Sequence, residues 1–367
     1  MNTMLVSEDL KDIASKVEAG ERLSREDGIR LFMSGDLLTI GSLANITRER
    51  KNGNKTYFIV NRHINHTNIC INQCRFCAFG RDKTAAGAYV MSLDEVESKA
   101  LESRNEGISE IHIVGGLNPE LPIDYYVEML KRVRRVLPGV IIQSFTAVEI
   151  DYLAQLHNMP VKEVLCTLQE AGLDSLPGGG AEIFSPHIRE KICPNKISGE
   201  KWLEVHRCAH EIGMRTNATM LYGHIENIED KVDHLIQLRT LQDQTGGFLT
   251  FIPLAFHPKN TPMESMGLSL TTGYDDLKVL AVSRLMLDNF DHIKAFWIMI
   301  GHKLAQVSLS FGVDDLDGTV VEEKIAHDAG AQTGQYLSKP DLVNMVKAAG
   351  RVPVQRDTLY NVVEEGF

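Results

Sequence analysis

The feature that most restricts the fold is a repeated alternation of strand-like runs and amphipathic helical stretches after Tyr57. Each run is apolar or β-branched, and the stretch that follows it has its apolar residues at helical spacing. The strand-like runs cover residues 57–65, 109–114, 140–145, 173–177, 215–221, 247–253, 292–297 and 307–311. Alternation of this kind favours a parallel sheet with helical crossovers. About eight units predict an α/β protein with a (β/α)8 barrel, and a doubly wound open sheet is the alternative.

The N-terminal fifty residues have a different texture. Apolar residues at helical spacing predict three helices before Lys51, with a stop at Gly20 and a capping-box start at Ser24. No chemically distinctive motif lies on them. We therefore expect an N-terminal helical extension over residues 1–55 and a barrel domain over residues 56–367.

Composition limits the possible partners and the compartment. The 367 residues carry a formal net charge of -11, which argues against nucleic acid as a partner. The longest apolar runs are far too short to cross a bilayer, and the acidic start MNTMLVSEDLKD does not resemble a signal peptide. We expect a cytoplasmic protein with reduced thiols, in which clustered cysteines indicate metal binding or catalysis.

Three of the six cysteines, Cys70, Cys74 and Cys77, form a C-x3-C-x2-C motif directly after the first predicted strand. In a parallel barrel the loops at the carboxyl ends of the strands form the active site. The remaining cysteines are scattered, and we expect them to be buried, inert thiols: Cys166, Cys193 and Cys208.

Two kinds of metal site are compatible with three clustered cysteines. A structural zinc site needs four ligands, so His63 or His66 would have to complete it, which would make the chain a zinc-stabilised binding protein. An iron–sulfur cluster held by only three thiolates keeps one iron open to a substrate or cosubstrate. In that case the missing fourth ligand is the functional feature.

The motif, with Phe76 just before its last cysteine, resembles the signature of radical S-adenosylmethionine (SAM) enzymes. The resemblance implies a [4Fe-4S] cluster on the three cysteines, with SAM chelated to the open iron and Phe76 near the adenine. The reduced cluster would cleave SAM into methionine and a 5′-deoxyadenosyl radical. It also implies a reducing partner such as flavodoxin or ferredoxin.

Further cofactor contacts are expected at the ends of later strands. Gly115 and Gly116 follow the second strand, where the family has a glycine-rich turn that meets the methionyl amino group of SAM. Glu182 follows a triple glycine and could bind the ribose or the substrate. Tyr222 and Gly223 loosely resemble a motif that supports the adenine. The alternatives are an ordinary turn, a solvated carboxylate and a helix start.

A wider resemblance covers residues 60 to 325. The stretches HINHTNICINQCRFCAF, GGLNPELPIDYY, LPGGGAEIF, MLYGHIE, FIPLAFHP and FGVDDLDGTVVEE are similar, in this order, to the menaquinone and deazaflavin branch of radical SAM enzymes. AEIF and AFHP most resemble the synthase family of the futalosine route to menaquinone. The sister cyclase family, which acts on dehypoxanthine futalosine, shares the cluster motif and GGGAEI and differs at these two points.

The synthase resemblance implies a specific transferase reaction. The radical adds to the enol-ether double bond of 3-[(1-carboxyvinyl)oxy]benzoate, and rearrangement with loss of a carboxylate gives 6-amino-6-deoxyfutalosine. This small-molecule substrate is anionic and carries two carboxylates, so its pocket needs cations or hydrogen-bond donors. The candidate substrate-binding residues are His66, Arg81, His257 and Lys294, with Asp315 as a polar group of the pocket.

Overall fold

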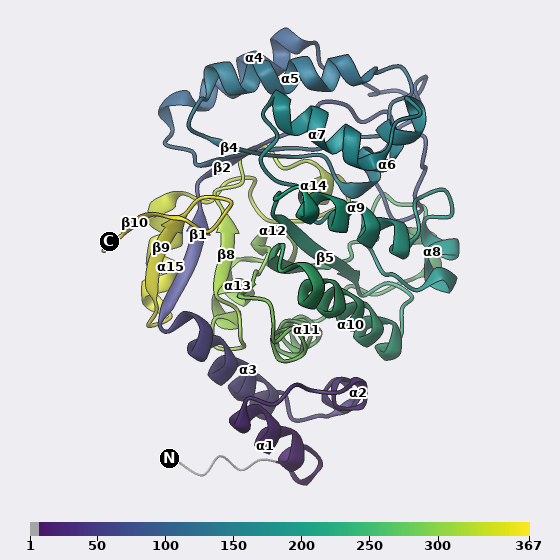
Figure 1. The fold of residues 1–367 in the computed structure, drawn as a ribbon. Helices are drawn as coiled ribbons and strands as arrows, with labels where there is room; N and C mark the ends of the chain where they lie inside the picture. The colour runs from purple at the N-terminus through teal and green to yellow at the C-terminus, as the bar shows by residue number, and fades with distance from the viewer. Residues whose placement is uncertain (1–6) are drawn as a thin grey trace.

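The computed structural model describes residues 7–367, with the strands in the middle of the molecule and most helices around them (Figure 1). The strands are β1 (Lys55–Ile59), β2 (Asn61–Ile64), β3 (Glu110–Ile113), β4 (Ile141–Ser144), β5 (Thr216–Tyr222), β6 (Phe248–Ala255), β7 (His292–Ile293) and β8 (Asp315–Gly318). They pair in parallel within three sheets: β1 pairs with β8, β3 lies between β2 and β4, and β6 lies between β5 and β7. The element order is therefore the one that the alternation in the sequence predicts.

Isolated parallel bridges join the three sheets into a barrel. The fourth predicted run contributes Ser175, which bridges to Gln143 of β4, and Leu176, which bridges to Thr216 of β5. Lys294 bridges to Asp315 between β7 and β8, and Arg62 of β2 bridges to Val321 after β8. The closed order confirms the predicted α/β barrel and is incompatible with a doubly wound open sheet.

Two of the strand predictions need correction. The first run is two strands, because β1 pairs with β8 and with a later strand whereas β2 pairs with β3. The eighth run, 307–311, is not a strand, because residues up to Ser308 belong to helix α13 (His302–Ser308). The eighth strand is the acidic segment DLDG, which is fully buried and does not look like a strand by composition.

The C-terminal residues form a part of the sheet that the sequence did not predict. Helix α15 (Lys339–Ala348) leads into β9 (Val352–Arg356), which pairs in parallel with β1, and β10 (Val362–Glu365) returns antiparallel to β9. Ser109 Oγ, just before β3, donates to the Arg356 carbonyl oxygen. β9 thus lies along the whole of β1 and beside the start of β3, at the end of the barrel opposite the cysteine motif.

The helices surround the ring and extend it at one end. The barrel helices are α4 (Leu93–Glu102), α5 (Ile123–Val136), α6 (Ala147–Leu156), α7 (Val161–Ala171), α8 (Pro186–Ile192), α9 (Gly199–Glu211), α10 (Ile228–Thr245), α11 (Gly273–Met286), α12 (Trp297–Ile300) and α14 (Ile325–Asp328). Within residues 7–367, none of the helices combines the length and apolar character needed to cross a bilayer.

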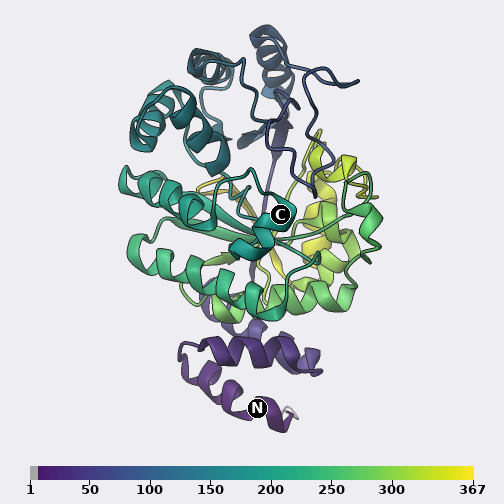
Figure 2. The same cartoon turned by 90° about the vertical axis from the view of Figure 1, so that its right-hand side faces the viewer.

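The N-terminal extension contains the three predicted helices, α1 (Lys11–Ala19), α2 (Arg25–Met33) and α3 (Leu37–Asn52). Gly20 ends α1 with φ +75°, and the capping box predicted at Ser24 is present. Figure 2 shows the purple helices stacked below the barrel. α3 packs against α11 and α2 against α10, so the extension is attached to the barrel helices.

Candidate functional site

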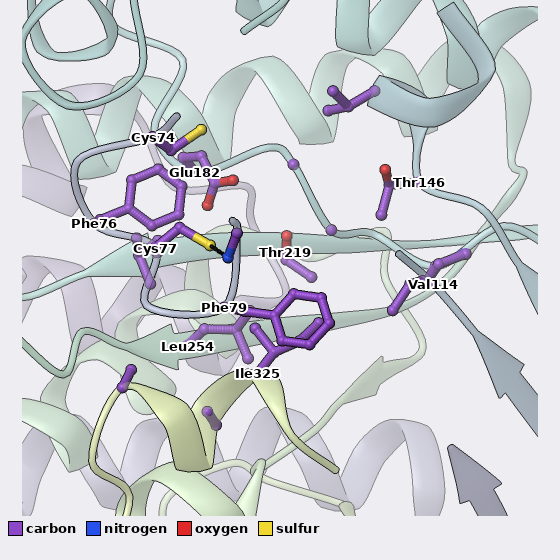
Figure 3. A pocket seen from close by; sticks show the side chains of 18 of the residues that line it. Cys74, Phe76, Cys77, Phe79, Val114, Thr146, Glu182, Thr219, Leu254 and Ile325 are labelled. Carbon is purple, nitrogen blue, oxygen red and sulfur yellow. Dashed lines mark hydrogen bonds between the residues drawn. The ribbon is translucent and has the colours of Figure 1, made fainter. Parts of the chain in front are cut away.

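A cavity of about 540 Å³ opens at the carboxyl ends of the strands, directly against the cysteine loop. Its size is typical of a site for one or two small molecules. Figure 3 shows Phe76, Cys77 and Phe79 of this loop facing strand residues such as Thr219 and Leu254. Most of the wall is apolar, and the polar groups are concentrated in a few places described below.

Cys70, Cys74 and Cys77 all line the cavity. Backbone hydrogen bonds anchor their loop to several neighbours: Cys70 N donates to Arg81 O at 3.0 Å, and Arg75 N donates to Ile192 O at 2.8 Å. The loop therefore presents three thiols to one space from a fixed backbone.

Neighbouring groups affect the charge state of two of the sulfur atoms. Gly80 N–H donates to Cys77 Sγ at 3.4 Å, the kind of contact that stabilises a thiolate. Burial raises the pKa of the Cys74 thiol to about 12, against the opposing effect of the nearby Lys196. A free thiolate is thus disfavoured here, whereas one bonded to a metal is compensated.

The three thiols do not form a site for a single ion. Among residues 7–367, no group of three or more His, Cys, Asp and Glu side chains converges as the ligands of one metal ion. A structural zinc ion needs four ligands around one centre. Cluster thiolates, in contrast, bind separate irons, so the donor set on this loop fits an iron–sulfur cluster.

Gly115 and Gly116 lie on the cavity wall, as predicted, and close packing explains why both are glycine. A Cβ at Gly116 would lie 2.2 Å from the carbonyl oxygen of Ile69, and one at Gly115 would lie 2.4 Å from Cε1 of His66. The turn after β3 therefore fits directly behind the cysteine loop. The expected contact of this turn with SAM stays a prediction.

Glu182 also lies on the wall, in a small charged group that includes the aromatic residue of the cysteine motif. Its φ of +48° is a left-handed conformation that costs energy for a residue with a side chain. Lys196 Nζ binds Glu182 Oε1 at 2.6 Å and lies 5.1 Å from the centre of the Phe76 ring. Sequence reasoning missed Lys196, because it follows α8 and no motif marks it.

Glu149 is a second wall residue that the sequence reasoning missed. It is the third residue of α6 and forms a capping box with Thr146, and its Oε1 accepts from Gly115 N–H at 3.1 Å. Burial raises the pKa of this carboxyl to about 7, although the backbone and hydroxyl donors around it act in the opposite direction. The capping-box spacing was the only sequence signal for this residue.

Two of the predicted site residues, Tyr222 and Gly223, are not on the cavity wall. Tyr222 is buried, and its hydroxyl donates to Asp276 Oδ1 at 2.8 Å, away from the cavity. Gly223 N–H donates to Glu226 Oε1 at 2.7 Å, and with φ +87° it forms the turn before α10. In this structure both residues shape the end of β5, and their contact with the cofactor stays a prediction.

His66 and Asp315 are likewise displaced from the cavity. His66 lies behind Gly115 with its ring edge-on to Tyr126, 5.6 Å between ring centres, so it packs the turn. Asp315 accepts from Arg356 Nε at 2.6 Å and from the Tyr360 hydroxyl at 2.8 Å. Its carboxylate thus binds the C-terminal segment to the barrel. The sequence did not indicate this role, because strand β9, which carries Arg356, was not predicted.

The other three predicted substrate-binding residues do line the cavity. Arg81 Nη1 donates to the Gly80 carbonyl oxygen, His257 Nε2 lies 3.0 Å from the Met299 carbonyl oxygen, and Lys294 Nζ donates to Asp317 Oδ1 at 2.8 Å. Their contact with a substrate stays a prediction.

Comparison with known proteins identifies the family. Residues 64–238, which contain all three cysteines, match the model of the radical SAM superfamily, and residues 245–366 match the CofH/MqnC C-terminal region. The aminodeoxyfutalosine synthase of Thermus thermophilus is 50% identical over 96% of this chain and 95% of its own length. The chain belongs to the radical SAM superfamily.

Further relatives place this radical SAM chain among two kinds of transferase. The aminodeoxyfutalosine synthase of Streptomyces coelicolor is 43% identical over 97% of this chain and 94% of its own. The 5-amino-6-(D-ribitylamino)uracil–L-tyrosine 4-hydroxyphenyl transferase of Methanopyrus kandleri is also 43% identical, over 85% of each chain.

Solved structures support the same radical SAM fold. Methylornithine synthase (PylB) superposes with a TM-score of 0.74 at 20% identity, covering 93% of this chain and 97% of its own. The [FeFe]-hydrogenase maturase HydG superposes with a TM-score of 0.72 at 17% identity, covering 95% of this chain and 76% of its own. At these identities the likeness concerns the fold alone.

Proposed function

We propose that the protein is an aminodeoxyfutalosine synthase. It would join the 5′-deoxyadenosyl group of SAM to 3-[(1-carboxyvinyl)oxy]benzoate, with rearrangement and loss of a carboxylate, to give 6-amino-6-deoxyfutalosine for menaquinone biosynthesis. The single observation that carries this proposal is the 50% identity, over nearly the whole of both chains, to a relative of that name. The radical SAM motif and its large cavity are compatible with it.

The cysteine loop would hold the cofactor. Cys70, Cys74 and Cys77 are the proposed ligands of a [4Fe-4S] cluster, with SAM as cosubstrate beside it. When bound, the cluster and SAM supply the 5′-deoxyadenosyl radical. A reducing partner such as flavodoxin or ferredoxin would deliver the electron, and we expect the reaction to take place in the cytoplasm.

The other wall residues would position the two small molecules. Phe76 would contact the adenine, and Glu182, whose carboxylate is paired with Lys196, would bind ribose hydroxyls; all three residues line the cavity. A primary carbon radical abstracts hydrogen from nearby groups, so the reacting alkene has to be held in contact with it and away from water. Barrel walls such as Val114 and Leu254 enclose the cavity with apolar surface that serves this purpose.

A second candidate function follows from the C-terminal match. The region 245–366 matches the CofH/MqnC model, and the Methanopyrus kandleri 4-hydroxyphenyl transferase is 43% identical to this chain. The alternatives are therefore that transferase reaction and the dehypoxanthine futalosine cyclase reaction on the same scaffold. They differ from the synthase in the fate of the adenosyl group, which the product analysis below measures.

Mass spectrometry of the product tests the proposal. Reduced, cluster-loaded protein is incubated without oxygen with SAM and each candidate substrate, and Cys74→Ala serves as the inactive control. The synthase incorporates the adenosyl group into its product, so a mass equal to 6-amino-6-deoxyfutalosine is expected. Release of free 5′-deoxyadenosine without an adduct, or turnover only of the other substrates, would refute the assignment.

A further inference from the structure

A polar layer crosses the lumen of the barrel at the floor of the cavity. Strand register places His63 of β2 opposite His112 of β3, and His112 opposite Gln143 of β4. Paired residues of neighbouring strands point to the same face, and all three residues line the cavity. Barrel interiors are normally filled by branched apolar side chains, so a layer of imidazoles and an amide needs an explanation.

Hydrogen bonds fix one of the two imidazoles and leave the other free. His112 Nδ1 lies 3.2 Å from Gln143 Oε1, and the His112 ring stacks on the His63 ring with 4.6 Å between centres. Within residues 7–367, the His63 ring makes no hydrogen bond, although His63 lines the cavity. His63 therefore presents unused ring nitrogens to any molecule that reaches the floor.

The charged groups around this pair come from three strands. Lys294, after β7, donates to Asp317 of β8, and their side chains are only 7% and 8% exposed. Glu110 of β3 is engaged below the layer, where it accepts from Asn61 Nδ2 at 3.2 Å and from Thr358 Oγ1 at 2.8 Å. The Lys294 ammonium has three N–H donors and binds Asp317 through one of them, so N–H groups remain beside the two imidazoles.

The rest of the cavity is suited to the body of an aromatic acid. Val114, Leu254 and Phe296 line the space and offer apolar surface to an aryl ring. In the proposed substrate the enol carboxylate is bonded to the reacting alkene, which has to stay close to the cysteine loop. The ring carboxylate lies on the other side of the ether oxygen and points away from that loop.

We propose that His63, His112 and Lys294 form a subsite for the ring carboxylate of an aryl carboxylic acid substrate, an inference that rests on the proposed function. The carboxylate accepts hydrogen bonds from His63 and Lys294, and His112, stacked on His63 and fixed by Gln143, positions the first ring. Burial lowers the pKa of both imidazoles, so they are neutral in the empty site. An incoming carboxylate favours the protonated form of an imidazole. The imidazole then adds positive charge to the subsite, where the charge of Lys294 is already partly balanced by Asp317.

Equilibrium binding separates this role from a structural one. The cluster-loaded protein with SAM is titrated by calorimetry, without oxygen, with the diacid and with 2-phenoxyacrylate, which lacks only the ring carboxylate. His63→Gln and Lys294→Met are the test variants. His187→Gln and Lys131→Met, both at exposed positions outside the cavity, are the matched controls. Iron content and SAM affinity report whether each variant is correctly folded.

The expected result is selective. Each test variant binds the diacid about 10- to 100-fold more weakly than the wild type and binds 2-phenoxyacrylate within about threefold, and the controls change neither. Equal weakening of both ligands, or of neither, would overturn the subsite. If the wild type binds the diacid selectively but does not convert it, the proposed function fails and the subsite stands. If it converts the diacid while the variants lose no selectivity, the subsite alone fails.

Discussion

Replacement of Gly116 by alanine tests how tightly the turn after β3 supports the cysteine loop. The new Cβ would lie 2.2 Å from the Ile69 carbonyl oxygen, 2.7 Å from its carbon and 2.9 Å from Cys70 Cβ. The first two atoms belong to the backbone, so no side-chain rotation relieves the overlap. Because non-bonded atoms settle above 3 Å, the loop has to move by roughly 1 Å.

A displacement of this size is large for a metal ligand. Metal–ligand distances tolerate deviations of about 0.2 Å, so a roughly 1 Å shift at Cys70 is expected to reduce cluster binding several-fold. Overpacking of a well-packed region also costs about 1–3 kcal/mol in the free energy of unfolding. The structure thus predicts a protein that folds, is less stable and holds little iron.

Iron and acid-labile sulfide per chain, measured after anaerobic reconstitution, check the first effect, and urea unfolding checks the second. The matched control is Gly139→Ala, since a Cβ at Gly139 meets nothing within 4 Å. The control should keep wild-type cluster content and stability. If Gly116→Ala also keeps both, the turn does not support the cysteine loop and the reasoning from close approach is wrong.

Three further substitutions test charged groups, two on the cavity wall and one at the opposite end of the barrel. Lys196→Met leaves the Glu182 carboxylate buried without its cation, so the free energy of unfolding, measured by urea denaturation, should fall by about 3–5 kcal/mol. A second substitution in the same chain, Glu182→Gln, should restore part of this loss. Arg356→Met leaves Asp315 without its cation and should cost a similar amount, while iron content stays normal because the pair lies at the opposite end of the barrel. Glu149→Gln tests pH dependence, because the Glu149 carboxyl keeps its proton up to about pH 7 in the folded protein and only up to about pH 4.5 in the unfolded one. Wild-type stability should therefore fall relative to the variant as pH rises between these values, and the difference should become constant above them. Unfolding curves at pH 5 to 8 measure this trend.

Each of these expectations has a clear contrary result. Unchanged stability of Lys196→Met would mean that the ion pair contributes nothing in solution. Loss of iron from Arg356→Met would show that the base of the barrel controls the cysteine loop. A wild type that becomes more stable relative to Glu149→Gln as pH rises would contradict the protonated, buried carboxyl.

The parts of the site that could be predicted are those encoded locally. Cys70, Cys74 and Cys77 are spaced within one loop, so their common function is readable without tertiary structure. Gly116 was found because a glycine pair after a strand marks a close approach of backbone. The barrel was predictable for a related reason, since each strand–helix unit carries its own periodicity.

The residues that were missed depend on contacts between distant segments. Lys196 reaches Glu182 and Phe76 only because the segment after α8 folds back beneath the cysteine loop. The strand DLDG was missed because acidic residues are rare in buried strands. Its Asp315 is buried only because Arg356 of the distant strand β9 pairs with it. Tyr222 was assigned to the cofactor by likeness to a motif, whereas its hydroxyl binds Asp276.

Mössbauer spectroscopy of iron-57 in oxygen-free protein tests the central claim most directly, because it reports the ligands of each iron. The claim is that Cys70, Cys74 and Cys77 hold a [4Fe-4S] cluster with one iron open to SAM. The account predicts one distinct iron site whose spectrum changes on addition of SAM, in the wild type and not in Cys74→Ala. A spectrum in which all four irons have only sulfur ligands and which does not change on addition of SAM would contradict the claim.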